Sequence, residues 1–249
     1  MQKIALVTGA TSGIGWATAE ALADKGFDLI ICGRRKERLE ELASKLSVKT
    51  LQLTFDVRDR KAVDEALGSI PEDWKSIDVL INNAGNAHGL SKIQDGNVDD
   101  WDAMIDINVK GLLYVTKALV PQMIERGSGH VVNVGSIAGK EVYPNGNVYC
   151  ASKHAVDAIN NGMRLDLMGT GVKVSQVCPG LVETEFSLVR FKGDSGKADT
   201  VYQGYDPLTA QDIADLIQFI VTRPAHVNIA DTLILPTAQV ASTMVHKTL

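Results

Sequence analysis

The chain has 249 residues, of which 45% are apolar and 22% charged, and its formal charge is −5. This composition is typical of a globular protein and excludes a disordered chain, a collagen and a coiled coil. A surface that binds a nucleic acid duplex needs a basic face, so the acidic balance argues against a nucleic acid partner.

The three cysteines and the apolar runs indicate the compartment. Cys32, Cys150 and Cys178 are widely spaced, odd in number and form no CxxC pair, so no zinc knuckle or disulfide framework is readable, which favours a reducing environment. No apolar run approaches the ~20 residues that span a bilayer. We therefore expect a soluble cytoplasmic protein with no bound metal and no membrane partner.

Short apolar runs alternate with longer amphipathic segments along the whole chain. Strands are expected at residues 4–7, 29–32, 50–55, 78–81, 130–134, 172–177 and 232–235. Helices are expected at residues 13–25, 36–46, 59–69, 98–126, 148–168 and 209–222. About seven buried strands separated by helices predict a single α/β domain over residues 1–249, a Rossmann-like doubly wound parallel sheet with helices on both faces.

The one long stretch without a clear period covers residues 185–207. A long irregular segment inside a compact domain is usually functional or mobile. It follows the sixth strand, at the carboxyl edge of the sheet where such folds bind ligands. We expect it to be a substrate loop.

A glycine-rich turn follows the first strand. Such a turn lets the chain approach a pyrophosphate, and the helix N-terminus behind it presents free N–H groups to the anion. A glycine triplet alone also occurs in ordinary turns, but its place after the first strand favours nucleotide binding. No Gly-Lys-Ser/Thr follows, which disfavours ATP hydrolysis. The candidate contacts are Gly9, Thr11, Ser12, Gly13, Ile14 and Gly15.

The end of the second strand indicates which cofactor binds. An NAD site has an acidic residue there for the ribose 2′-hydroxyl, whereas this chain has Arg34 and Arg35. Two guanidinium groups suit a 2′-phosphate and predict NADP, although they also fit the first turn of a surface helix. Asp56 and Val57 end the third strand and are candidates for adenine contact; Asp56 is alternatively a helix cap.

Tyr149 and Lys153 are one helical turn apart, downstream of Ser136 at a strand end. A dehydrogenase acting on a hydroxyl group must move the alcohol proton as hydride leaves carbon. A nearby ammonium lowers the pKa of a tyrosine and suits it to this task. The Ser136 hydroxyl can hold the substrate oxygen. Tyr-x-x-x-Lys pairs are common on exposed helices, so the pattern gains weight from the phosphate-binding turn and the serine.

Taken together, these motifs resemble the short-chain dehydrogenase/reductase family over nearly the whole chain. The motifs are the glycine turn, residues 82–85 (Asn-Asn-Ala-Gly), Asn108, Ser136, Tyr149, Lys153, and Pro179-Gly180. The resemblance implies that Tyr149 is the general acid and base, that Lys153 tunes it and binds the nicotinamide ribose, and that Ser136 orients the substrate. It also implies a proton-relay water at Asn108, whose alternative is a solvent-facing helix position.

The resemblance implies further cofactor contacts. Asn83, Ala84 and Gly85 would line the adenosine-ribose side, with polar packing at a strand end as the alternative for the asparagine. Contacts with the nicotinamide are implied for Pro179, Gly180, Val182 and Thr184.

Residues 33–42, 146–149, 189–194 and 224–229 resemble the NADP-dependent 3-hydroxy acid dehydrogenases of this family. That branch implies a homotetramer and oxidation of a small 3-hydroxy acid at C3, or reduction of the semialdehyde. The acids are of the serine, allo-threonine, 3-hydroxyisobutyrate and 3-hydroxypropionate type. A desolvated carboxylate needs a cationic partner. Arg190 is the candidate anchor, ahead of Lys192; both are alternatively solvated or near the pyrophosphate.

Three other residues have structural interpretations. His88 is expected in a wall of the site, and Cys150 and Cys178 are expected to be small buried residues.

Two other functions compete with the leading one. A 3-oxoacyl carrier-protein reductase, or another carbonyl reductase of the family, would have a basic docking patch, which is not visible in this acidic chain. An NADP-sensing binding protein would not need Ser136, Tyr149 and Lys153.

Overall fold

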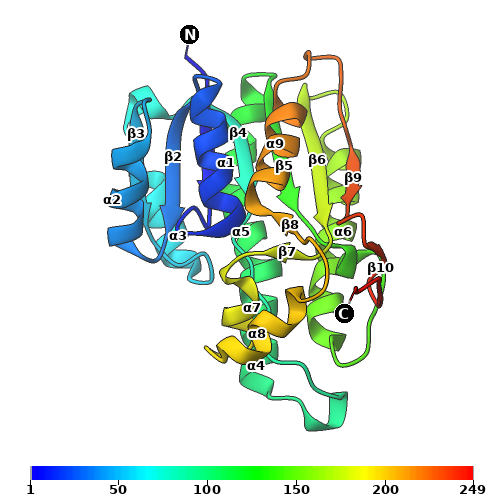
Figure 1. Cartoon of the computed structure of the whole chain (residues 1–249). Helices are drawn as coiled ribbons and strands as arrows, with labels where there is room; N and C mark the ends of the chain where they lie inside the picture. Colours follow the sequence, from blue (N-terminus) through cyan, green and yellow to red (C-terminus); the bar gives the residue numbers. More distant parts are fainter. Residues whose placement is uncertain (1, 249) are drawn as a thin grey trace.

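Seven parallel strands form the centre of the molecule (Figure 1). The computed structural model describes residues 2–248. In pairing order the strands are β3 (Thr50–Thr54), β2 (Asp28–Gly33), β1 (Ile4–Thr8), β4 (Ile77–Asn82), β5 (Gly129–Val134), β6 (Val172–Pro179) and β9 (Asp231–Ile234). The order reverses between β1 and β4, which is where doubly wound sheets open a ligand crevice. The predicted Rossmann-like fold is confirmed.

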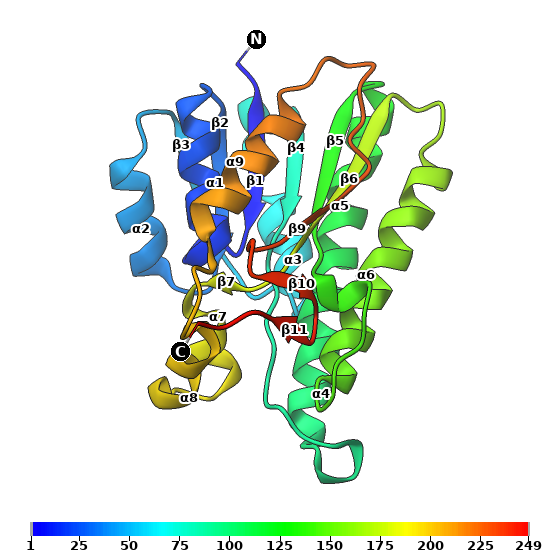
Figure 2. The same cartoon turned by 45° about the vertical axis from the view of Figure 1, so that its right-hand side comes forward.

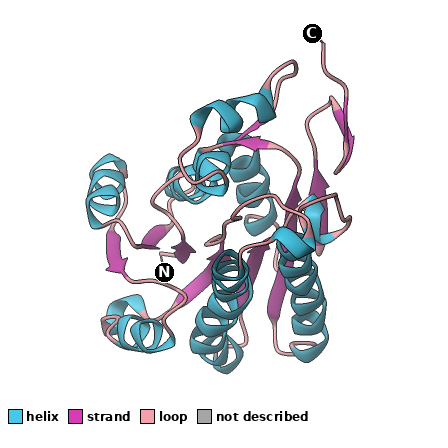
Figure 3. Ribbon diagram, turned by 90° about the horizontal axis from the view of Figure 1, so that it is seen from below, coloured by secondary structure: helices cyan, strands magenta, loops and turns pink. Residues whose placement is uncertain are grey.

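Helices cover both faces of the sheet, as Figure 3 shows in the view from below. One face carries α1 (Gly13–Asp24), α2 (Lys36–Lys45) and α9 (Ala210–Val221). The other carries α3 (Arg60–Gly68), α5 (Leu112–Glu125) and α6 (Asn147–Asp166).

Side chains of the central strands alternate between these two layers. Val7 and Ile31 pack in the first layer, and Leu6 and Ile30 pack in the second. All four are fully buried, which explains why these strands read as continuous apolar runs. Burying each such side chain contributes about 1.5–3 kcal/mol, and together these layers fix the strand ends that form the site.

Two helix caps agree with local sequence signals. Thr209 and Asp212 form a capping box at the start of α9. The cap of α3 is Asp59, which accepts a hydrogen bond from the Lys61 N–H at 2.9 Å. Asp56 is therefore not the helix cap and lies two residues beyond the end of β3.

The predicted helix at residues 98–126 contains a change of pitch. It consists of α4 (Val98–Ile105), a π-helical turn η3 (Asp106–Gly111) and α5. Three short 3₁₀ turns occur elsewhere, η1 (Glu72–Trp74), η2 (Ile93–Asp95) and η4 (Ile137–Gly139).

The prediction that residues 185–207 are irregular was wrong. They include α7 (Glu185–Arg190) and α8 (Ser195–Tyr202). Thr184 and Asp194 cap the two helices through the Phe186 and Lys197 N–H groups. The two helices have six and eight residues, which is too short for an apolar period to show in the sequence. The short strands β7 (Val182–Glu183), β8 (Leu208–Thr209), β10 (Gln239–Ala241) and β11 (Met244–Val245) were missed for the same reason.

Helices α7 and α8 lie below the carboxyl edge of the sheet in Figures 1 and 2. The C-terminal segment runs beside them. Its Thr248 N–H donates to the carbonyl of Gly204, two residues after the end of α8, at 2.8 Å. Across residues 2–248, none of the helices combines the length and the apolar character needed to cross a bilayer.

Candidate active site

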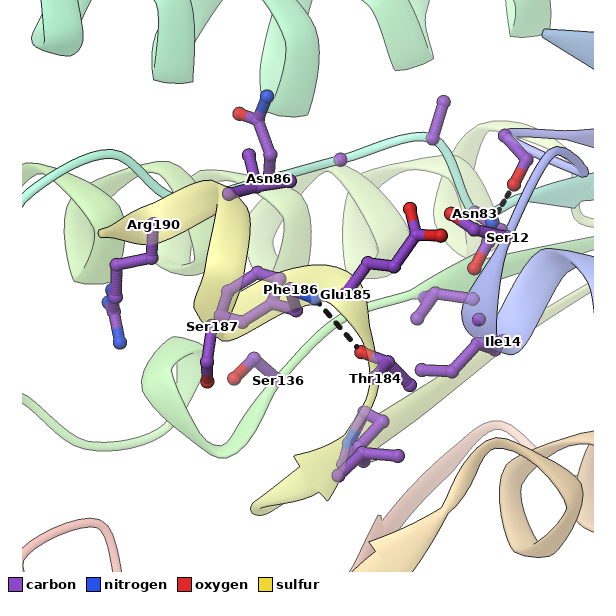
Figure 4. A pocket seen from close by; sticks show the side chains of 18 of the residues that line it. Ser12, Ile14, Asn83, Asn86, Ser136, Thr184, Glu185, Phe186, Ser187 and Arg190 are labelled. Carbon is purple, nitrogen blue, oxygen red and sulfur yellow. Dashed lines mark hydrogen bonds between the residues drawn. The ribbon is translucent and has the colours of Figure 1, made fainter. Parts of the chain in front are cut away.

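A cavity of about 520 Å³ opens at the carboxyl edge of the sheet. That volume is within the range of small-molecule sites. Figure 4 shows residues from α1, from the strand ends and from α7 around it. Every predicted site residue lines this cavity except Gly15 and Asn108.

The glycine turn has the backbone that its sequence predicts. Gly9 and Gly13 have φ angles of 67° and 53°, in the left-handed region that favours glycine. Gly15 has a packing role, because a Cβ there would lie 2.4 Å from the Gly9 carbonyl oxygen. Ser12 makes no side-chain cap on α1, so the first N–H groups of this helix face the cavity without a side-chain acceptor. These features fit a pyrophosphate.

The arginines at the end of β2 lie at the rim of the cavity. Arg35 donates from Nη2 to the Thr11 carbonyl at 3.1 Å and from Nη1 to Glu185 Oε2 at 3.0 Å. Arg34 lies 3.8 Å from Asp56, which is held more closely by Arg58 at 2.7 Å. Although partial burial raises the pKa of Asp56, hydrogen bonds from Arg58 lower it overall. Two guanidinium groups thus stand where the sequence predicts a 2′-phosphate.

Ser136, Tyr149 and Lys153 all line the cavity. The Ser136 Oγ accepts a hydrogen bond from the Ala138 N–H at 3.0 Å, which leaves its own proton for another acceptor. Lys153 is buried, and its Nζ donates to the Val134 carbonyl at 2.9 Å. A Cβ on Gly139 would lie 2.6 Å from the Lys153 carbonyl oxygen. Turn η4 therefore fits against α6 and holds Ser136 beside the helix that carries the other two residues.

Burial sets the pKa of the Tyr149 phenol here, and the expectation that Lys153 lowers that pKa stays a prediction. Burial, and to a lesser extent Tyr143, raise the pKa of the Tyr149 phenol, while Arg190 and Ser136 lower it by less. Burial also lowers the pKa of Lys153, to about 8. The largest effect on the phenol is desolvation, and the Lys153 ammonium is bound to the Val134 carbonyl rather than to the phenol. At neutral pH the phenol is protonated and suited to donate.

Asn108 lies in the π-helical turn and is 2% exposed, so the solvent-facing alternative is wrong. Its side chain exchanges two hydrogen bonds of 2.9 Å with the backbone of Asn86 and donates to Ser152 Oγ at 3.0 Å. π-Helical turns are frequent at functional sites. Asn108 ties the loop after β4 to α6, and its role in a proton relay remains a prediction.

Asn83 packs at the strand end as its alternative predicts, and its contact with the adenosine ribose stays a prediction. It lines the cavity, and its Nδ2 donates to the Thr8 carbonyl at 2.9 Å, which joins the end of β4 to the glycine turn. Its neighbour Asn82 is buried and donates to Thr116 and Asn133, as polar packing predicts.

Arg190 lies beside Tyr149, with its Cζ 5.0 Å from the centre of that ring. The Tyr143 and Phe186 rings lie 5.7 and 5.6 Å from the same atom, and the Tyr143 hydroxyl accepts a hydrogen bond from Arg190. The Arg190 carbonyl accepts from the Gly89 N–H at 2.9 Å, which fixes the end of α7. The sequence analysis missed Tyr143 and Phe186, whose only signal was their nearness in sequence to Tyr149 and Arg190.

The remaining expectations have mixed outcomes. Lys192 is outside the cavity and pairs with Asp100 at 3.0 Å. His88 is not among the lining residues, although Asn86 and Leu90 on either side of it are. All three cysteines are free and buried, as expected for Cys150 and Cys178.

The fold, the glycine turn and the serine, tyrosine and lysine at one cavity define a nucleotide-dependent oxidoreductase. The family model described as short chain dehydrogenase matches residues 3–193, and the chain belongs to that family. This confirms the predicted family.

Named relatives span nearly the whole chain. Sulfoacetaldehyde reductase 2 of Chromohalobacter salexigens is 48% identical over 242 residues, 96% of each protein. The NADP-dependent 3-hydroxy acid dehydrogenase YdfG of Escherichia coli K12 is 46% identical over 237 residues, 95% of this chain and 96% of the relative. A solved structure of the closed form of serine dehydrogenase complexed with NADP+ superposes with a TM-score of 0.94 at 45% identity, over 98% of this chain and 100% of that one.

Proposed function

We propose that the protein is an NADP-dependent oxidoreductase that moves hydride between the nicotinamide and C3 of a small 3-hydroxy acid. Its substrates are acids of the serine, allo-threonine, 3-hydroxyisobutyrate or 3-hydroxypropionate type, or the matching semialdehydes. The observation that carries this proposal is the Arg190 guanidinium, whose Cζ lies 5.0 Å from the centre of the Tyr149 ring in the wall of the same cavity. The names of the relatives support the cofactor and the substrate class.

The residues that would hold NADP fall into three groups along the cavity. The pyrophosphate would lie on the glycine turn and the start of α1, and the 2′-phosphate near Arg34 and Arg35. Bound NADP supplies or accepts the hydride. The remaining contacts are Asp56, Val57, Asn83, Ala84, Gly85, Pro179, Gly180, Val182 and Thr184, with Lys153 at the nicotinamide ribose.

The protein's own residues handle the proton. In reduction, Tyr149 donates its phenolic proton to the carbonyl oxygen of the substrate, and it takes the proton back in oxidation. The Ser136 hydroxyl donates a hydrogen bond to the same substrate oxygen and fixes the distance of that oxygen from the phenol. Because all three of Ser136, Tyr149 and Lys153 line the cavity, the site supports catalysis better than mere NADP sensing.

Arg190 would bind the acid group of the substrate. Its Nε–H is buried and makes no hydrogen bond with any residue between 2 and 248, so a donor remains for a ligand. Aromatic rings surround the guanidinium and exclude water, which strengthens its attraction for an anion. A sulfonate presents the same negative oxygens as a carboxylate. A 2-sulfo aldehyde is therefore the second candidate substrate, favoured by the sulfoacetaldehyde reductase relative.

A substrate panel tests the proposed function. With NADPH and the nicotinamide absorbance as readout, we expect kcat/KM for malonic semialdehyde to exceed that for propanal by at least about tenfold, because only the former gains a charge-assisted bond. The kcat/KM for sulfoacetaldehyde in the same assay shows whether the site prefers a sulfonate or a carboxylate. Equal rates for propanal and both anionic aldehydes would contradict the proposal.

The pH dependence of reduction follows from the two shifted groups. Burial raises the pKa of Tyr149 and lowers that of Lys153 to about 8. The phenol therefore stays protonated while Lys153 loses its charge as the pH rises. Since the ammonium stabilises the phenolate that proton donation leaves, we expect kcat/KM for reduction to fall as the pH passes about 8. The Lys153→Met variant should be slower and lack this fall. A wild-type rate that rises through that pH would contradict the assignment.

We further propose a cytoplasmic homotetramer. Large apolar side chains are exposed on α9 and at the β9 edge of the molecule, where a second copy of the chain would cover them. They are Phe219, Leu233, Val240 and Met244. Three free, buried cysteines fit a reducing compartment. Light scattering coupled to gel filtration tests the assembly, and a monomer would contradict it.

A further inference from the structure

One ion pair crosses the rim of the cavity between the cofactor side and α7. Glu185, the first residue of α7, accepts a hydrogen bond from Arg35 Nη1 at 3.0 Å, and the two residues are 150 positions apart in the chain. Figure 4 shows the Glu185 side chain reaching from α7 toward the side of the cavity where Ser12 and Asn83 lie. The carboxylate therefore stands among the residues expected to contact the phosphates of the cofactor.

The other donors of Arg35 are already engaged. Its Nη2 donates to the carbonyl and the hydroxyl of Thr11 at 3.1 and 3.3 Å, and its Nε lies 3.4 Å from the same hydroxyl. A guanidinium has five N–H donors in a fixed fork. Those on Nη1 are the ones left for an anion, and Glu185 accepts a hydrogen bond from this nitrogen.

We propose that Glu185 sets how tightly the enzyme holds the 2′-phosphate, by competing with it for the Nη1 edge of Arg35. The inference rests on the proposed position of the 2′-phosphate beside Arg34 and Arg35. A phosphate and a carboxylate that share one guanidinium repel each other. Glu185 thus weakens the binding of NADPH but has little effect on NADH, which carries a neutral 2′-hydroxyl. The carboxylate lowers the preference for the phosphorylated cofactor and eases its release.

The test is the Glu185→Gln variant, which keeps the size of the side chain and removes its charge. Titration of nicotinamide fluorescence gives Kd for NADPH and for NADH without turnover. We expect Kd for NADPH to fall about three- to tenfold, with the change in Kd for NADH below about twofold. If the ion pair were instead a clasp that holds α7 closed, the variant would bind both cofactors more weakly. That result, or an unchanged Kd for NADPH, overturns the inference.

Two controls separate this inference from the proposed function. Glu183→Gln removes the charge of an exposed residue of β7, which is two residues away and outside the cavity lining, and should leave both Kd values within about twofold. The same gain with Glu183→Gln as with Glu185→Gln would make the effect one of net charge and overturn the inference.

The second control is Arg35→Met, alone and combined with Glu185→Gln. We expect Arg35→Met to raise Kd for NADPH by at least about tenfold and to abolish the effect of Glu185→Gln. If Arg35→Met leaves NADPH binding unchanged, the position of the 2′-phosphate is wrong. If Arg35→Met weakens NADPH binding while Glu185→Gln leaves it unchanged, the 2′-phosphate does lie beside Arg35. Only the inference about Glu185 then fails.

Discussion

Replacing Tyr149 with phenylalanine is expected to lower kcat for semialdehyde reduction by about a thousandfold, within the range of general acid catalysis. The substitution removes the phenolic proton and leaves the ring, which packs 5.7 Å from the ring of Phe186. The cavity keeps its shape, so Kd for NADPH measured by fluorescence should stay within about twofold of the wild-type value. Single-turnover absorbance measurements report the chemical step directly.

Tyr114→Phe is the matched control for this experiment. Tyr114 lies on α5 against the second layer of the core and does not line the cavity. It loses the same hydroxyl group, and its kcat should remain within about twofold of wild type. If Tyr149→Phe keeps more than about one-tenth of the wild-type kcat, the proton comes from another group or from water.

Much of the fold was predictable because each face of the sheet is fully covered. Leu6, Ile30 and Ile31 are 0% exposed, and such strands must be continuous apolar runs. The order of strands and helices then determines the parallel sheet and its switch point. Gly9 and Ser136 follow strand ends, so the topology alone brings them to one edge.

The electrostatics of the site was less predictable, because it depends on distances and burial. Spacing placed Tyr149 and Lys153 on one helix face, yet it gave no sign that Lys153 would bind the Val134 carbonyl. The π-helical turn at Asn108 has no compositional signature and appears only where backbone hydrogen bonds are known.

The residues around Arg190 were hidden for a topological reason. Tyr143 belongs to the loop before α6 and Phe186 to α7, and they meet only because α7 folds back below the sheet. Two short helices with three nearby glycines gave no periodic signal. The arginine itself was found because the charge of the expected substrate required a cation.

Replacing Arg190 with methionine is the sharpest test of that requirement. The change keeps much of the side-chain bulk among the aromatic rings and removes the charge. The KM for malonic semialdehyde should rise roughly ten- to a hundredfold, the cost of losing one charge-assisted hydrogen bond, whereas the KM for propanal should change less than about threefold. Lys192→Met is the matched control, because Lys192 is two residues away, pairs with Asp100 and lies outside the cavity. Removing that charge should leave both KM values nearly unchanged.

If Arg190→Met instead raises the KM for malonic semialdehyde and the KM for propanal equally, Arg190 shapes the pocket. The substrate carboxylate would then need another partner.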